Sequence, residues 1–246
     1  MINDITNNID SDISIFADDT RILRPVNTFE DVEALQDDLN KLYQWQETNN
    51  MAFNSNKFEV LRYGWNQELK NSTEYLTPDS EDLIERKEAL RDLGIQMSDT
   101  GKFSNHVESV CSRVRQKCGW ILRTFNSRNT FFMKFMWKSL VQGVIDYCSQ
   151  LYYPMQSTEL QSLENLMKTY TKKIPEVSHL DYWRRLKHLK MYSQQRRAER
   201  YKILYIWKIL EGLVPNCGVE ESNESERRGR MCKVLICRGK ESIKTL

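Results

Sequence analysis

The most informative part of the sequence lies near its amino terminus and reads Ser11-Asp12-Ile13-Ser14-Ile15-Phe16-Ala17-Asp18-Asp19-Thr20. Apolar and polar residues alternate before the two aspartates, and Thr20-Arg21-Ile22-Leu23 continues towards Pro25. Alternation with a period of two is typical of a half-buried strand, and aspartate tolerates the backbone geometry of a tight turn. We therefore expect residues 1–27 to form a β-hairpin with Asp18 and Asp19 at its tip.

Two adjacent carboxylates at a hairpin tip have a possible chemical meaning beyond the turn itself. Hard divalent cations such as Mg²⁺ and Mn²⁺ prefer oxygen ligands, and a bound cation relieves the repulsion between two like charges. Asp18 and Asp19 are therefore candidate metal ligands. The simpler alternative is that Asp-Asp is only a favourable turn sequence, and the dipeptide by itself favours that alternative.

After the hairpin, the pattern first mixes helix and strand. Thr28 followed by Asp31 predicts a capped helix start, and apolar residues then recur at helical spacing as far as Asn49-Asn50. We expect a strand over Phe58–Gly64, a loop over 66–82, and a short strand pair or bend over Leu90–Met97.

From about residue 103 the apolar residues follow the spacing of packed helices. The stripes run from Phe103 to Phe125, from Phe131 to Cys148 and from Leu160 to Tyr170, and further helices are expected over 179–211. The sequence thus predicts an α+β chain that is mainly α. It would consist of a small antiparallel sheet with a helix in residues 1–99, a helical bundle in 100–214 and a disordered tail in 215–246.

The net charge of +2 conceals a strong division between the two halves of the chain. Residues 1–99 carry 9 basic and 21 acidic side chains, whereas residues 100–246 carry 27 basic and 13 acidic ones. Such a division indicates an acidic unit joined to a basic unit, and the basic unit would attract polyanions. The alternative explanation of the charge division is an uneven distribution of charge over solvent-exposed helix surfaces, without a polyanionic partner.

The positive charge is concentrated in residues 168–208, with 12 Lys and Arg against three acids and with Tyr and Trp interleaved. Cations neutralise phosphates by releasing counterions, and aromatic rings stack on unpaired bases. We expect a nucleic-acid surface formed by Lys172, Lys173, Arg184, Arg185, Lys187, Lys190, Arg196, Arg197, Arg200 and Lys202. The alternative is a solvated basic face with aromatic residues in the core, which is the interpretation we favour for Tyr201, Leu204 and Tyr205.

Several other classes of protein are disfavoured. No apolar run approaches the roughly 18 residues that a membrane helix needs, and the amino terminus lacks the pattern of a signal peptide. The six cysteines lack zinc-site spacing, so we expect reduced thiols in an intracellular protein of the nucleus or cytoplasm. His106, His179 and His188 share no spacing, and we expect structural roles for them.

Phe16-Ala17-Asp18-Asp19-Thr20 within an apolar hairpin resembles the aromatic-x-Asp-Asp hairpin of the reverse transcriptase palm. Ile2-Asn3-Asp4-Ile5 is similar to the segment before this hairpin in LINE-type (non-LTR) retrotransposons. Residues 35–57, which end in Asn54-Ser55-Asn56-Lys57, resemble the next block, a helix leading into an Asn-x-x-Lys turn. Leu93-Gly94-Ile95 with Phe103-x-x-His106 resembles the block that grips the primer end. The following helices, to Gly212, are similar to the thumb of jockey-like elements, so the resemblance covers roughly residues 1–230.

The resemblance implies RNA-directed DNA polymerisation for a mobile element, with an RNA template and a DNA primer as partners. In the family, two cations held by palm carboxylates align the primer 3′-oxygen and the nucleotide phosphate for nucleotidyl transfer. Asp18 would be the main ligand of Mg²⁺ or Mn²⁺, Asp19 a weaker one, and Lys57 a proton donor near the pyrophosphate. Leu93, Gly94 and Ile95 would form the primer grip. The role of Lys57 rests on the resemblance, because a lysine at a strand start is ordinarily just solvated.

The family's fingers, its first catalytic aspartate and its nucleotide-selecting block lie upstream of the hairpin, and this sequence begins after them. Asp12 lies six residues before Asp18 on the same strand, hence roughly 20 Å away, so the two cannot share a metal. We expect weak Mg²⁺ binding, no primer extension by this chain alone, and an unpaired sheet edge near Ile13 and Ile15 that favours self-association. The alternatives are a non-catalytic nucleic-acid-binding remnant that uses residues 168–208 and a helical interaction protein.

Overall fold

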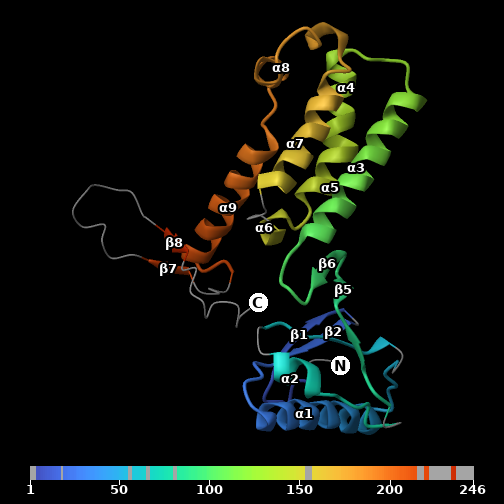
Figure 1. The fold of residues 1–246 in the computed structure, drawn as a ribbon, viewed down its shortest axis with the longest axis vertical. Coiled ribbons are helices and arrows are strands. Elements are labelled where there is room, and N and C mark those ends of the chain that lie inside the picture. Colours follow the sequence, from blue (N-terminus) through green and yellow to red (C-terminus); the bar gives the residue numbers. More distant parts are fainter. Residues whose placement is uncertain are drawn as a thin grey trace, which may run out of the picture. The chain divides into compact units, whose positions relative to one another are not determined.

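A computed structural model describes residues 4–17, 19–54, 57–64, 67–79, 82–152, 157–214, 219–221 and 234–236. It divides into two compact units, residues 1–90 with 98–101 and residues 91–97 with 102–246 (Figure 1). The fold is α+β and mainly α, as the sequence predicts. Within the described ranges, no helix is both long and apolar enough to cross a bilayer.

The amino-terminal hairpin forms as expected. β1 (Asp12–Phe16) pairs with antiparallel β2 (Asp19–Leu23) in a register that places Phe16 opposite Asp19. Asp19, which we expected at the tip, is the first residue of β2, and Asp18 lies outside the described residues. This sheet has no third strand in the part of the chain that the structure describes.

The predicted capping box starts α1 (Phe29–Thr48). Asp31 N donates to Thr28 Oγ1 at 3.3 Å, and Thr28 N donates to Asp31 Oδ2 at 3.0 Å. The acidic first turn also complements the positive end of the helix dipole. At the other end, Asn49 N donates to Trp45 O, so the helix stops where the sequence indicates.

Short elements complete the first unit and its boundary. β3 (Glu59–Leu61) runs parallel to β4 (Glu85–Lys87), and β5 (Ala89–Asp92) pairs with β6 (Ile95–Ser98). The prediction of an uninterrupted loop over 66–82 is wrong, because α2 (Gln67–Ser72) lies within it. A polar helix of six residues is too short to show a hydrophobic period.

The second unit is a helical bundle (Figure 1). Its helices are α3 (Ser104–Thr124), α4 (Thr130–Met136), α5 (Gln142–Asp146), α6 (Ser149–Tyr152), α7 (Ser157–Thr171), α8 (Tyr182–Leu189) and α9 (Gln194–Leu210), with a 3₁₀ turn at Pro175–Val177. The first and third predicted stripes supply much of the core, in which Val114 and Leu163 are buried. The second stripe is wrong in part, because Phe131 and Phe135 are 82% and 56% exposed and the neighbouring Met133 is buried instead. Cys111 lies in this core and Cys118 packs against it.

Several backbone irregularities interrupt the helical pattern, including the left-handed Cys148 between α5 and α6. A π-helix, Trp137–Val141, joins α4 to α5 where the sequence predicts one continuous stripe. Lys190, which caps α8, has a φ of +50° and lies in the left-handed region. Segments of π-helix occur frequently at functional sites.

Residues 91–97 belong to the second unit, although the sequence analysis placed them in the first domain, residues 1–99. Gln96 N donates to His106 Nδ1 at 3.3 Å, and Tyr147 Oη donates to Leu93 O at 2.7 Å. These contacts tie the β5–β6 turn to the helices.

The end of the chain is described only in part. β7 (Val219–Glu221) pairs with antiparallel β8 (Val234–Ile236). From the sequence we expected disorder here and did not predict this strand pair. The remainder of that expectation, from residue 215, lies outside the described residues.

Candidate nucleic-acid interface and carboxylate hairpin

Asp38 of α1 anchors the start of β1. Its side chain is almost fully buried and accepts hydrogen bonds from Ser11 N at 2.9 Å and Ser11 Oγ at 2.6 Å. Lys41 Nζ and Arg24 Nη1 lie 3.0 and 3.3 Å from its oxygens. Burial opposes ionisation of Asp38, but the hydrogen bonds from Ser11 and Lys41 outweigh it and hold the pKa below its ordinary value. The base of the hairpin is thereby fixed to α1.

The tip of the hairpin is strained and exposed. Ala17 has a φ of +55°, a conformation that costs a non-glycine residue roughly 1–2 kcal/mol. Asp19 is exposed, and Phe16 opposite it is 62% exposed. The predicted ligand Asp18 lies outside the described residues. Strained residues of this kind cluster at active sites and ligand clamps.

The surroundings of Asp19 limit what it can do. In the register of the hairpin, Asp12 pairs with Leu23, at the opposite end from Asp19. Among the described residues, no three His, Cys, Asp or Glu side chains are grouped so that they could hold a metal. An exposed carboxylate fits the oxygen chemistry of Mg²⁺, but on its own it supports only weak binding.

Lys57 lies in the turn that the sequence predicts. Its N–H donates to Asn54 O at 2.9 Å, and its side chain is exposed. The structure therefore offers the Lys57 ammonium to solvent, with no partner among the residues that are described.

The predicted primer-grip residues form the tight turn between β5 and β6. Leu93 and Gly94 have φ values of +44° and +84°, whereas Ile95 is buried. The side chain of Tyr147 covers this turn: it donates to Leu93 O and would lie 3.6 Å from a Cβ at Gly94. Tyr147 was missed by the sequence analysis, because no local pattern reveals a contact across 54 residues.

His106 has the structural role that we expected. The ring is buried, contacts Tyr152 edge to face and accepts the hydrogen bond from Gln96 N at Nδ1. Burial lowers the pKa of His106, and the nearby charges of Arg113 and Arg91 lower it further.

Most of the predicted nucleic-acid residues are available to a ligand. Lys172, Lys173, Arg184, Lys187, Lys190, Arg196 and Arg200 are exposed, and Lys202 is partly exposed. The end of α7 and the middle of α8 adjoin, because the Arg185 guanidinium donates to Lys168 O at 3.2 Å. The exposed cations at these two elements thus share one region of the bundle.

Arg185 does not belong to this surface. It is 4% exposed, and its guanidinium donates to Leu180 O at 2.8 Å and to Thr171 Oγ1 at 3.4 Å. These bonds join α8 to α7, so we correct its predicted role from nucleic-acid contact to packing. Its spacing from Tyr182 and Leu186 on the buried face of α8 is the signal that sequence reasoning overlooked.

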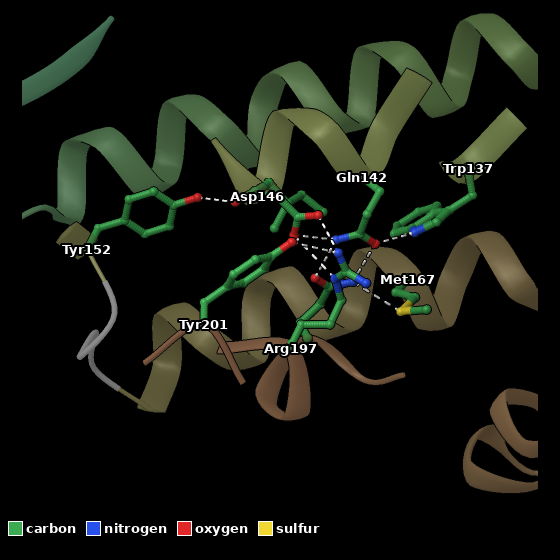
Figure 2. A network of polar contacts seen from close by, with 9 residues as sticks. Trp137, Gln142, Asp146, Tyr152, Met167, Arg197 and Tyr201 are labelled. Atoms are coloured by element: carbon green, nitrogen blue, oxygen red, sulfur yellow. Dashed lines mark hydrogen bonds and ion pairs between the residues drawn. The ribbon is translucent and has the colours of Figure 1, made fainter. Parts of the chain in front are cut away.

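Arg197 is held in a polar network that links α5, α7 and α9 (Figure 2). Its guanidinium pairs with Asp146 and donates from Nη2 to Tyr201 Oη at 3.1 Å. Gln142 Nε2 donates to the same Asp146 at 2.8 Å, and Trp137 Nε1 donates to Gln142 Oε1 at 2.8 Å. The network therefore fixes the direction of Arg197 relative to the π-helix.

Several aromatic rings of this region are also exposed. Trp183, Tyr192 and Trp207 are among them, and Leu204 and Tyr205, which we expected in the core, are each 39% exposed. The expectation of burial is wrong for these two because α9 turns that part of its surface away from the bundle core.

Comparison with protein-family models, with curated proteins and with solved structures finds no match for this chain.

Proposed function

We propose that this chain provides the palm hairpin and thumb of a LINE-type reverse transcriptase, and that by itself it binds a primer–template hybrid. The observation that carries the proposal is the set of exposed cations that directly follow α7 and lie on or next to α8 and α9, interleaved with exposed aromatic rings. Cations that release counterions from phosphates supply most of the affinity of such an interface.

The cations of this set are largely free to pair with phosphates. Lys172, Lys173 and Lys187 make no ion pair with any residue that the structure describes, and Arg184 has only the exposed partner Asp181. An exposed ion pair contributes little and is readily exchanged for another anion. Tyr192 and Trp183 offer rings on which unpaired bases can stack.

The hairpin supports the reverse transcriptase assignment. Mg²⁺ or Mn²⁺ would be held by Asp18 and Asp19, and it would align the primer oxygen with the nucleotide phosphate. Asp19 is exposed and close to the strained Ala17, which suits a ligand at the tip. Asp12, at the far end of β1, cannot complete the site.

The test of hybrid binding compares two doubly substituted chains. Lys173→Gln with Lys187→Gln removes two exposed charges of the basic region, whereas Arg113→Gln with Arg115→Gln removes two exposed charges of α3. Fluorescence anisotropy with a labelled RNA–DNA hybrid should show about tenfold weaker binding for the first pair, since each exposed ion pair contributes up to about 1 kcal/mol and a tenfold change corresponds to about 1.4 kcal/mol. Equal losses for both pairs would mean that only net charge matters, and would contradict the proposal.

Primer extension tests the second half of the proposal. The purified chain should incorporate no nucleotides on a primed RNA template with Mg²⁺ or Mn²⁺, because a two-metal site needs carboxylates that converge from separate strands. Template-dependent incorporation that disappears on substitution Asp19→Asn would show that this chain completes an active site, and would overturn the restriction to binding.

A further inference from the structure

A cavity of about 240 Å³ lies in the second unit between the π-helix, α7 and the start of α9. Four of its lining residues are cations, namely Lys138, Lys190, Arg197 and Arg200, and none is acidic. Trp137 and Tyr192 contribute aromatic surface, and Gln142 contributes an amide. The volume is several times the ~30 Å³ share of one water molecule, so the cavity has room for more than a single small ion.

Three of the four cations around this cavity are not neutralised by a neighbour, whereas Arg197 pairs with Asp146. Lys138, Lys190 and Arg200 make no ion pair with the residues described. Lys134 stands close by: burial lowers its pKa, and the charges of Lys138 and Lys190 lower it further. Like charges gathered in this way destabilise the free protein, and an anion between them removes that cost.

Arg197 is prepared for a ligand. Its Nε and Nη2 atoms are occupied by Asp146 and Tyr201, whereas Nη1 has no partner among the described part of the chain. Because Gln142 holds the same Asp146, the guanidinium cannot swing away without breaking the network (Figure 2). A donor held in advance loses little entropy when it binds.

Two of the backbone irregularities of the bundle border this cavity. The π-helix contains Trp137 and Lys138, and Lys190 is the residue in the left-handed conformation. The π-helix and the left-handed backbone of Lys190 each lower the stability of the fold, and such unfavourable backbone conformations are typical of ligand-binding sites.

Tyr192 supplies a stacking surface at the same place. Arg196 lies over its ring, 4.9 Å from the centroid, and the residue is 49% exposed. The cation restrains the ring while leaving part of it open. Stacking of a base on such a ring contributes roughly 1–3 kcal/mol.

We propose that this cavity binds a single nucleotide, with its phosphate among Lys138, Lys190, Arg197 and Arg200 and its base on Tyr192. This inference deepens the proposed function and rests on it. The nucleotide could arrive as a free mononucleotide or as one unit of a strand, and in both cases the phosphate and the base are recognised by the same groups.

Titration calorimetry on the full chain tests the site with a nucleoside 5′-monophosphate, the matching nucleoside, inorganic phosphate and a short single-stranded oligonucleotide. The monophosphate should bind, whereas the nucleoside and phosphate, which each lack half of the ligand, should bind at least about tenfold more weakly. Competition by the oligonucleotide would identify a strand as the source, and its failure to compete would identify the free nucleotide.

Two variants separate the cavity from general charge. Lys138→Gln with Arg200→Gln should weaken binding of the monophosphate about tenfold or more, whereas Arg113→Gln with Arg115→Gln should leave it within about twofold. Tyr192→Leu should weaken the monophosphate but not inorganic phosphate. Circular dichroism establishes that each variant is folded.

The outcomes distinguish this inference from the proposed function. If the chain binds the hybrid but no monophosphate, the cavity inference is wrong and the proposed function stands. If the monophosphate binds equally to the cavity variant and the α3 variant, the location is wrong. If the chain binds neither ligand, both proposals fail.

Discussion

Ala17 occupies a backbone region that glycine adopts without steric cost, at a φ of +55°. The substitution Ala17→Gly should therefore raise the free energy of unfolding of the first unit by about 1 kcal/mol, because the strain of the methyl group is removed. The matched control is Ala34→Gly in the middle of α1, which should lower it by about 1 kcal/mol. Denaturant unfolding measures both changes, and a loss of stability for Ala17→Gly would show that this residue is not strained.

His106 makes the stability of the second unit depend on pH. Its pKa in the folded chain lies below the value of 6.5 in the unfolded chain, so the unfolded state binds the proton more tightly. The stabilisation of the fold that comes from neutral His106 is complete above pH 6.5. It is lost as the pH falls towards the lowered pKa, by up to about 1.4 kcal/mol per pH unit.

The variant His106→Gln measures this effect. The difference in unfolding free energy between the natural chain and the variant should be larger at pH 7.5 than at pH 5.5, because the natural chain alone loses stability on acidification. A difference that stays constant between these two values would contradict the assignment of a buried neutral imidazole.

At the scale of single residues, local patterns predict much, but not the partners of buried polar groups. Thr28 and Asp31 are three positions apart, so their capping box is visible in the sequence. Asp38 meets Ser11 across 27 residues and Tyr147 meets Leu93 across 54, and no local period encodes such contacts. The helical spacing of Arg185 from Tyr182 and Leu186 signals its burial, but the carbonyl groups that it binds, Leu180 O and Lys168 O, are not visible in the sequence.

The elements of the first unit depend on the Asp38 anchor. Asp38→Asn removes its ion pairs with Arg24 and Lys41 and weakens the hydrogen bonds from Ser11. We expect a loss of about 2 kcal/mol in the stability of the hairpin and α1, since the hydrogen bonds from Ser11 to a charged, buried acceptor are weakened, while the partly exposed Arg24 and Lys41 turn to solvent.

Hydrogen exchange of the β1 and β2 amides measures that loss. Asp37→Asn is the matched control, because Asp37 is the same residue type one position earlier and is exposed. It should change stability by less than about 0.5 kcal/mol. If the two variants exchange alike, Asp38 does not anchor the hairpin.

At the scale of elements, a hydrophobic period identifies a long helix and misses what is short or irregular. The stripes of α3 and α7 and the alternation of β1 were sufficient to predict those elements. The six-residue α2 has no such stripe, and the π-helix differs from an α-helix by one residue per turn within an apolar run. Tertiary packing, rather than local sequence preference, determines where the π-helix forms.

At the scale of the whole molecule, the β1–β2 sheet should promote self-association. It has two strands in the described residues, and a two-stranded sheet leaves backbone groups able to pair with another chain. Sedimentation equilibrium should detect oligomers whose proportion rises with protein concentration. The substitution Ser14→Lys, at an exposed position of β1, should reduce this association. The control substitution Ser112→Lys, at an exposed position of α3, should not. A monodisperse monomer at high concentration would contradict this expectation.

The division of charge is the property of the whole chain that most strongly indicates a polyanionic partner. Residues 100–246 carry an excess of positive charge, and the exposed cations that directly follow α7 and lie on or next to α8 and α9 account for a large part of it. Binding that depends on these cations must respond to salt, because each neutralised phosphate releases a counterion.

The most direct measurement is the affinity of the full chain for an RNA–DNA hybrid between roughly 50 and 200 mM monovalent salt. The logarithm of the binding constant should fall linearly with the logarithm of the salt concentration, with a slope of about −0.9 for each phosphate contact and a total loss of at least about tenfold. An affinity that is unchanged across this range, or the absence of binding at the lowest salt, would contradict the account.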